Sequence, residues 1–454
     1  MRALASEGVL DPKDHIEKLK QLHPDAPLPA VPDPVPKSRL TQPFNKADFH
    51  LVVKHAKWKK AADALGWRMD HVKILSQEAL NVLFPLCLRM AKNPRLIPER
   101  LRPFFFGARL TPIGKKDGGI RPIAIGTIFH KIVSSAIMAH IKGELPGVFA
   151  PVQFGVGIPG GAENVVHGVR NTLLIDQSKV LVSLDLQNAF NSVDRNAFIS
   201  AVQEKFPSLL CWTLQAYGSP SKLTMRGCDP IDSAAGVRQG DPMGPFLFCL
   251  AIQPALLRIG NLVDSLTCMD DIYLVGHSVN MRTALRTLEE DLLKLSLRIN
   301  FTKSWSHKPI TGLSQEIPVN PNPVVMKVPL RCDKPIDQLG NKVVKSIDAI
   351  ANVDNVQIAL LLLRQINNGS LTYTMRTSCP EVTKIVTASL QGKVTNALAS
   401  ILHCTLESVE AAKDRIFMPI GPGLGLAPPP RHRAAGLPGK PPTGHNKTQH
   451  TKQC

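Results

Sequence analysis

The chain has 454 residues, of which 54 are Lys or Arg and 36 are Asp or Glu, so its formal net charge at pH 7 is +18. This length allows two or three domains, and the basic excess favours a polyanionic partner, although it can also serve solubility alone. The nine cysteines occur without a Cys-x-x-Cys pair, which argues against a structural zinc site and for a reducing compartment. No apolar run has the length of a membrane span and no signal-peptide core is visible, so we expect a soluble protein of the nucleus or cytoplasm, with no membrane partner.

The first 45 residues are a short polar segment followed by six prolines between Pro24 and Pro36. Such spacing favours an extended backbone without paired hydrogen bonds, so we expect residues 1–45 to be disordered. From Lys46 the apolar residues recur at helical spacing, as Val52, Val53, Ala56, Ala61, Ala62 and Leu65. The lysines of this stretch, Lys54, Lys57, Lys59 and Lys60, fit a solvated helix face and a nucleic-acid contact equally well.

A hairpin is predicted between residues 110 and 125. Leu110–Ile113 and Ile120–Ile125 are strand-like and enclose the turn Lys116-Asp117-Gly118-Gly119. Lys115, Lys116 and Arg121 lie beside this turn. Basic residues flanking a turn are solvent-exposed by default, but these are also suited to bind a triphosphate, Arg121 through two parallel hydrogen bonds and a lysine as a point charge.

Three carboxylates follow or interrupt apolar runs that predict strands. The run Val180–Leu184 ends at Asp185, whereas Asp270 and Asp271 separate the two halves of a hairpin. An Asp pair at a turn usually faces solvent, so context must decide its role. If the first strand lies beside the hairpin, Asp185 and Asp270 emerge at one edge of the sheet. Their oxygens can then hold two divalent cations, with Mg²⁺ or Mn²⁺ preferred over softer metals.

A glycine-bearing loop precedes an apolar helix between residues 236 and 257. Asp241 and Pro242 are placed as its N-cap and first helical residue, and the helix is apolar on all sides, which predicts burial. Gly240 permits close approach of another backbone, and Gln239 offers both a donor and an acceptor. Gly and Pro before a helix usually mark only a turn.

Further helices are predicted at 76–92, at 195–206 with Asp194 as N-cap, at 280–295, from a cap at Asp354 to about Gly369, and at 381–400. The stretch from 428 to 454 contains no acidic residue and cannot bury a core, so we expect it to be disordered.

Taken together, these segments resemble the reverse transcriptase family, and most closely the polymerases of non-LTR retrotransposons. The resemblance covers roughly Trp67 to Leu426, with its motifs in the family's order: 115–123, 153–155, Asp185 with Ala189-Phe190, 239–242, 270–271, and Asn300 with Lys303.

The resemblance implies an α+β polymerase of right-hand shape. Fingers would occupy 46–175, a palm with an antiparallel sheet and helices on one face 176–324, and a helical thumb 325–427, between the disordered segments 1–45 and 428–454. The implied activity is RNA-directed DNA polymerisation, in which a DNA primer on an RNA template is extended with deoxynucleoside triphosphates. Two Mg²⁺ ions per site are implied as cofactors, with Mn²⁺ as a substitute.

The resemblance also implies roles for individual residues. Asp185, Asp270 and Asp271 would be catalytic metal ligands, and Lys303 a proton donor to pyrophosphate or else an ordinary exposed lysine. Phe190 would exclude the ribose 2′ hydroxyl or else anchor the following helix in the core. Nucleotide-binding residues would be Lys115, Lys116, Arg121, Phe190, Gln239 and Gly240.

The chain departs from the family pattern in several places. Cys268 stands where an aromatic residue is common, Asn191 where Asp is frequent, and the primer grip is recognisable at best in Ile336–Gly340. No endonuclease signature is visible, so we expect a partial product of a longer element. The alternative function is that of a retroelement relic that binds nucleic acid through its basic surface and no longer polymerises.

Overall fold

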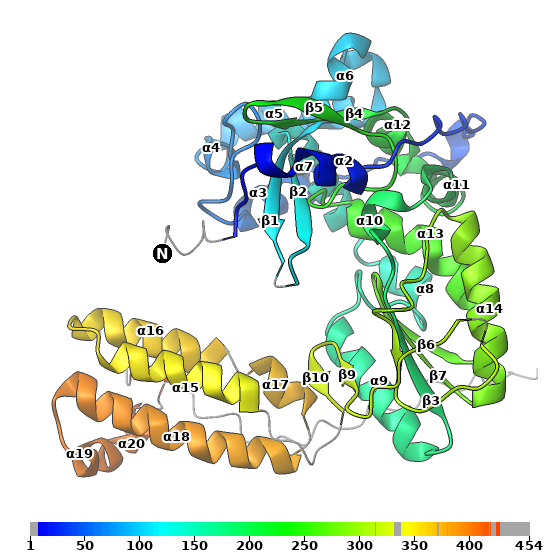
Figure 1. The fold of residues 1–454 in the computed structure, drawn as a ribbon. Coiled ribbons are helices and arrows are strands. Elements are labelled where there is room, and N and C mark those ends of the chain that lie inside the picture. The colour runs from blue at the N-terminus through cyan, green and yellow to red at the C-terminus, as the bar shows by residue number, and fades with distance from the viewer. Residues whose placement is uncertain are drawn as a thin grey trace, which may run out of the picture. The chain divides into compact units, whose positions relative to one another are not determined.

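The computed structural model describes residues 8–115, 117–313, 315–330, 337–369, 372–378, 380–416, 418 and 424–426. Lys116, Ile336 and the predicted disordered tail, 428–454, lie outside these residues. The chain divides into two units, Met1–Met326 and Lys327–Cys454. Helices and strands are mixed in an α+β fold, as Figure 1 shows for the labelled elements.

The N-terminal segment is folded where disorder was expected. It contains η1 (Lys13–His15), α2 (Ile16–Leu22) and η2 (Lys37–Arg39), and Leu19 is fully buried against the first sheet. Residues 24–36 lie in neither a helix nor a strand. The segment is nevertheless tied to the first unit, since Ala30 N donates to Asn196 Oδ1 (2.8 Å) and Asn188 Nδ2 donates to Leu22 O (2.9 Å). The prediction of disorder is therefore wrong for residues 8–45, because these partners lie far away in the sequence.

Between residues 46 and 145 the first unit contains mostly helices, together with two strands of the first sheet. The helices are α3 (Lys46–His55), α4 (Met69–Lys73), α5 (Gln77–Lys92), η3 (Pro94–Leu96), η4 (Glu99–Leu101), α6 (Arg102–Phe105) and α7 (Ile128–Ile141). The helix predicted to include Ala61 and Leu65 instead ends at His55. The backbone N–H of Lys59, which has a left-handed φ of 58°, donates to the Asp70 carboxylate (3.1 Å), and the chain continues as a loop.

The first sheet has the strand order β2-β1-β4-β5. Its strands are β1 (Ala108–Gly114), β2 (Ile120–Gly126), β4 (Ser221–Met225) and β5 (Cys228–Ser233). The predicted hairpin is present, since β1 and β2 pair antiparallel from Ala108 opposite Gly126 to Gly114 opposite Ile120. The hairpin therefore holds Lys115 and residues 117–119 at its tip.

The second sheet has the order β6-β7-β3-β8, with β3 (Val180–Leu184), β6 (Asp264–Cys268), β7 (Asp271–Gly276) and β8 (Trp305–Ser306). The surrounding helices are α8 (Leu145–Phe149), α9 (Gly161–Ile175), α10 (Ala189–Ser192), α11 (Arg195–Lys205), η5 (Pro207–Leu209), α12 (Leu210–Tyr217), α13 (Gly244–Arg258) and α14 (Ser278–Lys294). The predicted cap of α11 is confirmed, because the Asp194 side chain accepts a hydrogen bond from Asn196 N (3.0 Å).

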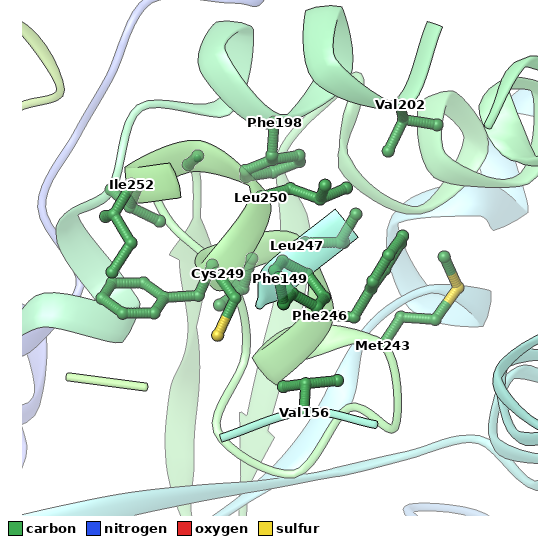
Figure 2. Close-up of a cluster of buried hydrophobic side chains, with 14 of the residues drawn as sticks. Phe149, Val156, Phe198, Val202, Met243, Phe246, Leu247, Cys249, Leu250 and Ile252 are labelled. Atoms are coloured by element: carbon green, nitrogen blue, oxygen red, sulfur yellow. The ribbon is translucent and has the colours of Figure 1, made fainter. Parts of the chain in front are cut away.

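Helix α13 occupies the centre of the core of the first unit. Phe246, Leu247, Phe248 and Leu250 are at most 1% exposed, and Figure 2 shows this helix packed with Phe149 and other apolar side chains. The prediction of a buried helix is confirmed. Its start is shifted, because Met243 is the N-cap and Asp241 Oδ1 accepts the Met243 N–H (2.9 Å) from outside the helix.

The second unit is helical over its described part after the short strand β10 (Val328–Pro329). Its helices are α15 (Asp337–Ala351), α16 (Val356–Gly369), α17 (Thr372–Thr377), α18 (Pro380–Leu402), α19 (Leu406–Ala411) and α20 (Lys413–Ile416). Ile347, Leu363, Val394 and Leu398 belong to its own buried core. The predicted cap at Asp354 is one residue early, since Asn355 Oδ1 accepts the Ile358 N–H (3.0 Å).

Across the described residues, no helix combines the length and apolar character that crossing a membrane requires.

Candidate active site

The two central strands of the second sheet bring Asp185 and Asp270 to one edge. β3 pairs antiparallel with β7, with Leu184 opposite Ile272, so Asp185 leaves the sheet where β7 begins. Cys268 lies opposite Asp271 in the β6–β7 hairpin, which leaves Met269 and Asp270 as the turn. Asp271 is thus the first residue of β7 and not part of the turn itself. The structure therefore places Asp185 and Asp270 at the same edge of the sheet, as the sequence predicted.

The pKa of Asp270 shows which charges surround it. This pKa is raised, first because neighbouring protein atoms remove part of the hydration of the carboxyl group, although the residue keeps exposed surface. The negative charge of Asp185 raises the pKa further, whereas the positive charges of Lys115 and Arg121 lower it. Asp270 therefore lies within electrostatic reach of the other carboxylate and of two cations from the β1–β2 hairpin.

Asp185 is oriented by the segment that follows α14. Asn300 Nδ2 donates to Asp185 Oδ2 (3.1 Å), and Asn300 N donates to Asp185 O (2.8 Å). The backbone N–H of Asp185 donates to Ser304 Oγ (3.1 Å). The sequence placed Asn300 in a motif but gave it no role, because its partner is 115 positions away. These contacts fix the direction in which the Asp185 carboxylate points.

Gln153 holds the hairpin turn in place. Its side chain is fully buried, and its Oε1 accepts the N–H groups of Met269 (2.8 Å) and Gly155 (3.1 Å). Its Nε2 donates to Met269 O (3.3 Å). A Cβ on Gly155 would lie 2.6 Å from Met269 N, so only glycine permits this close approach. The motif 153–155 therefore acts as a support for the turn that carries Asp270.

The predicted basic residues lie in different places relative to Asp270. Lys115 and Arg121 are exposed and near Asp270, whereas Lys116 lies outside the described residues. Lys303, from the segment that follows α14, reaches the hairpin tip instead, where its Nζ lies 3.1 Å from Asp117 Oδ2. Both side chains are about half exposed, so this ion pair is expected to contribute little to stability.

Phe190 lies in α10 and packs against α13. Its ring stacks on that of Phe248, and its carbonyl accepts the Val237 N–H (2.7 Å). Phe190 is only partly buried, whereas Phe248 is completely buried. One side of the Phe190 side chain is therefore anchored in the core, which agrees with the interpretation of Phe190 as an anchor of the following helix. Part of the residue nevertheless remains accessible.

The loop containing Gln239 and Gly240 is bound to β2. Ala124 N donates to Gln239 O (2.7 Å), and Gly240 has a φ of 128°. A Cβ on Gly240 would lie 2.3 Å from Ala124 O. Glycine is therefore required by both the backbone conformation and the space available. Gln239 is half-buried beside this contact.

A buried polar cluster below this loop was not foreseen. Asp241 accepts a hydrogen bond from the Tyr217 hydroxyl and lies 3.5 Å from both Arg238 Nη2 and His130 Nε2. Burial lowers the pKa of His130 to about 4, so the ring is neutral near pH 7. The pKa of Asp241 is lowered in spite of its burial, since the positive charge of Arg238 and the hydrogen bond from the Tyr217 hydroxyl favour the charged carboxylate. The residues next to His130 and Tyr217 in the sequence do not predict this role, because each side chain contacts Asp241 only after the chain has folded.

The donor set at the sheet edge fits a hard divalent cation. Among the described residues, no three His, Cys, Asp or Glu side chains are grouped closely enough to hold a metal ion. The structure thus brings Asp185 and Asp270 to one edge of the sheet, but it does not group Asp271 with them as the third predicted metal ligand. Two carboxylates still suit Mg²⁺, which is commonly bound by one or two carboxylates together with substrate phosphates and water.

Part of this chain is similar to a known protein family and to known proteins. Residues 113–317 match the family described as reverse transcriptase (RNA-dependent DNA polymerase). The 132 kDa protein of the retrotransposable element SLACS from Trypanosoma brucei gambiense is 30% identical over 158 residues, which cover 33% of this chain and 13% of that protein. The Pol polyprotein of the type-1 retrotransposable element R2 from Bradysia coprophila is 27% identical over 210 residues, covering 42% of this chain and 24% of that protein. The chain therefore spans less than a quarter of each of these two relatives.

A solved telomerase from Candida albicans, in complex with a TWJ fragment of telomeric RNA, aligns with a TM-score of 0.39 and 10% identity over 71% of this chain and 64% of that chain. A score at this level establishes neither a shared fold nor a shared function.

Proposed function

Because residues 113–317 carry a reverse transcriptase domain, we propose that this chain is an RNA-directed DNA polymerase of a non-LTR retrotransposon. It extends the 3′ hydroxyl of a DNA primer, on an RNA template, with deoxynucleoside triphosphates. The observation that carries the proposal is the position of Asp185 and Asp270 at adjoining strand ends, within electrostatic reach of Lys115 and Arg121. The helices α15 to α20 of the second unit take the part of the thumb, residues 325–427, in this proposal.

The carboxylates of Asp185 and Asp270 would hold the divalent cations, with Asp271 as a weaker contributor from the start of β7. When bound, two such cations lower the pKa of the primer hydroxyl and stabilise the charge of the triphosphate. Asn300 and Ser304 keep Asp185 directed toward the turn, and Gln153 keeps the turn in place. Such prior orientation matters because small displacements of a reacting group reduce the rate strongly.

The cationic hairpin would bind the triphosphate of the incoming nucleotide. Arg121 presents a planar set of donors that matches phosphate oxygens, and Lys115 adds a point charge. Lys116 belongs to the same proposal from its place in the sequence. Gln239 and Gly240 would border the nucleotide from the loop that is bound to β2, and the accessible part of Phe190 would face its sugar.

A primer-extension assay tests this function. We expect the full-length protein to extend a DNA primer on an RNA template, and Asp185→Asn or Asp270→Asn to abolish extension while primer–template binding measured in EDTA changes little. Asp264→Asn is the matched control, because Asp264 is an exposed carboxylate of the same hairpin, in β6, that pairs with Lys179 (3.1 Å) away from the turn. A wild-type protein that binds but never extends would support the alternative of a nucleic-acid-binding relic.

A further inference from the structure

One ion pair joins the tip of the β1–β2 hairpin to the segment that orients Asp185. Lys303 Nζ donates to Asp117 Oδ2 (3.1 Å), across 186 positions of the sequence. The backbone of Lys303 is fixed close to the catalytic edge of the second sheet, because Lys303 N donates to Asn300 O (3.1 Å) and Asn300 N donates to Asp185 O (2.8 Å). The ammonium group of Lys303 therefore extends from the segment beside Asp185 to the hairpin.

Asp117 carries the only negative charge of the hairpin turn. Residues 115–121 contain two lysines, one arginine and one acid. Asp117 Oδ1 accepts the Gly119 N–H (3.2 Å), and Lys115 N donates to Gly119 O (2.8 Å), so the turn holds this carboxylate in a defined direction. The pKa of Asp117 is lowered, first by the hydrogen bond from Lys303 and then by the one from Gly119. The carboxylate is therefore charged near pH 7, among the cations proposed to bind a triphosphate.

Other contacts hold the hairpin tip in place. Lys18 Nζ, from α2, donates to Gly118 O (3.3 Å). At the end of β1, Gly114 N donates to Gly8 O (2.7 Å), which ties the strand to the N-terminal segment. The ion pair between the turn and the palm is about half exposed on both sides, so it adds little to stability. The position of the tip therefore does not depend on this pair.

Lys303 has one charge and two anions to serve once a nucleotide is bound. An ammonium group that bridged Asp117 and a phosphate would bring two negative charges close together, and their repulsion opposes such a bridge. A lysine carries its charge on a flexible four-carbon stem, so the group can turn from one anion to the other while its backbone stays in place. A triphosphate held by Lys115 and Arg121 therefore competes with Asp117 for Lys303.

We propose that Asp117 is an internal competitor of the nucleotide triphosphate, which holds Lys303 while the site is empty and regains it when pyrophosphate leaves. Asp117 is thus a positioning residue, because it acts through Lys303 and not on the reacting atoms. Its competition weakens the binding of triphosphate and of pyrophosphate alike, since each must displace the carboxylate. The inference rests on the proposed polymerase function and adds a control of affinity at the same site.

The test measures the dissociation constant of inorganic triphosphate for the full-length protein by isothermal titration calorimetry, in EDTA and without nucleic acid. Asp117→Asn removes the charge but keeps an oxygen that can accept the Gly119 N–H, so the turn is preserved. We expect this variant to bind triphosphate about threefold more tightly, within the roughly fivefold range that exposed ion pairs allow. Asp117→Glu restores the carboxylate and should return the dissociation constant to the wild-type value.

Two further variants distinguish competition for Lys303 from a general change of charge. In a Lys303→Ala background, Asp117→Asn should no longer tighten triphosphate binding, because no lysine is left to release. Asp232→Asn is the matched control, since Asp232 forms the same kind of partly exposed ion pair with Lys222 (2.9 Å). That pair joins β4 to β5 in the same sheet, and β4 contacts β1 at Ala108, the end remote from the tip. The control should leave the dissociation constant unchanged.

Unchanged or weaker triphosphate binding by Asp117→Asn overturns the inference, and so does a wild type that binds no triphosphate. Tightening that persists without Lys303, or that Asp232→Asn equals, overturns it as well. Primer extension supplies a second readout: Asp117→Asn should lower the KM for the nucleotide about threefold and leave kcat nearly unchanged, a split that a loosened hairpin would not produce. Extension without the triphosphate effect contradicts only the role of Asp117, whereas the triphosphate effect without extension contradicts only the polymerase.

Discussion

The ring of Phe190 lies flat on the ring of Phe248, with their centroids 4.7 Å apart and their planes inclined by 14°. Phe248 is fully buried in α13, so the stack fixes the direction of a side chain that is itself partly exposed. Rigid support of this kind is what steric selection between two closely similar substrates requires. The core contact and the proposed role at the sugar are therefore compatible properties of one residue.

We expect Phe190→Ala and Phe190→Val to admit ribonucleotides at least about tenfold more readily, because removal of the ring opens space for the 2′ hydroxyl. The measurement is the ratio of kcat/KM for deoxynucleotide and ribonucleotide in primer extension. Phe248→Leu serves as a comparison, since it removes the stacked support and keeps Phe190 itself. An alanine variant with unchanged sugar selectivity would show that Phe190 only anchors α10.

Lys303 is expected to act on the reaction and not only on the hairpin tip. If it donates a proton to the departing pyrophosphate, Lys303→Ala should lower kcat about a hundredfold, the lower limit for general acid catalysis, with little change in KM. Asp117→Asn removes the partner at 3.1 Å and leaves the lysine in place, so kcat should be nearly normal. Equal effects of both substitutions on KM alone would assign the pair a structural role.

Affinity for nucleic acid should be electrostatic and independent of sequence, because the 54 Lys and Arg residues exceed the 36 Asp and Glu residues and leave a net charge of +18. Each contacted phosphate releases counterions, so log affinity should fall with log salt by about 0.9 per contact on duplex DNA and about 0.7 on single strands. Titrations of two unrelated RNA sequences over a range of salt concentrations measure the slope. A flat salt dependence, or a strong preference for one sequence, would contradict this expectation.

Buried His130 should make the first unit less stable in mild acid. Its pKa falls from 6.5 to about 4 on folding, chiefly because of burial, so the unfolded chain binds the proton at a higher pH than the folded one. The free energy of unfolding should therefore decrease as the pH falls from 6.5 toward 4, by up to about 3 kcal/mol.

Tryptophan fluorescence during urea unfolding measures this effect, since all four tryptophans belong to the unit Met1–Met326. The control is His130→Gln, which has no titrating ring and should show a weaker pH dependence over the same range. If the free energy of unfolding of the two proteins depended identically on pH, the pKa of His130 would be the same in the folded and the unfolded chain, and this prediction would be wrong.

Signals that act within a few residues could be interpreted from the sequence alone. Asp194 as a cap, the β1–β2 hairpin around residues 115–119 and the buried run of α13 were all found in this way. Caps, turns and apolar periodicity depend on neighbours in the chain, so their chemistry is visible before the fold is known. The same local rules placed Asp185 and Asp270 at strand ends, which was sufficient to suggest where a site should be.

Contacts between distant residues were decided by the tertiary structure. Asn300 reaches Asp185 across 115 positions, and Gln153 reaches Met269 across 116. Asp63 joins α7 to the loop that follows α3 over 65 positions, where the helical pattern had predicted continuous helix. In each case a single polar side chain finds its partner only after strands and helices have packed. The sequence therefore determined which residues carry the charge, and the tertiary structure decided their orientation, because a hydrogen bond depends on position in space and not on separation along the chain.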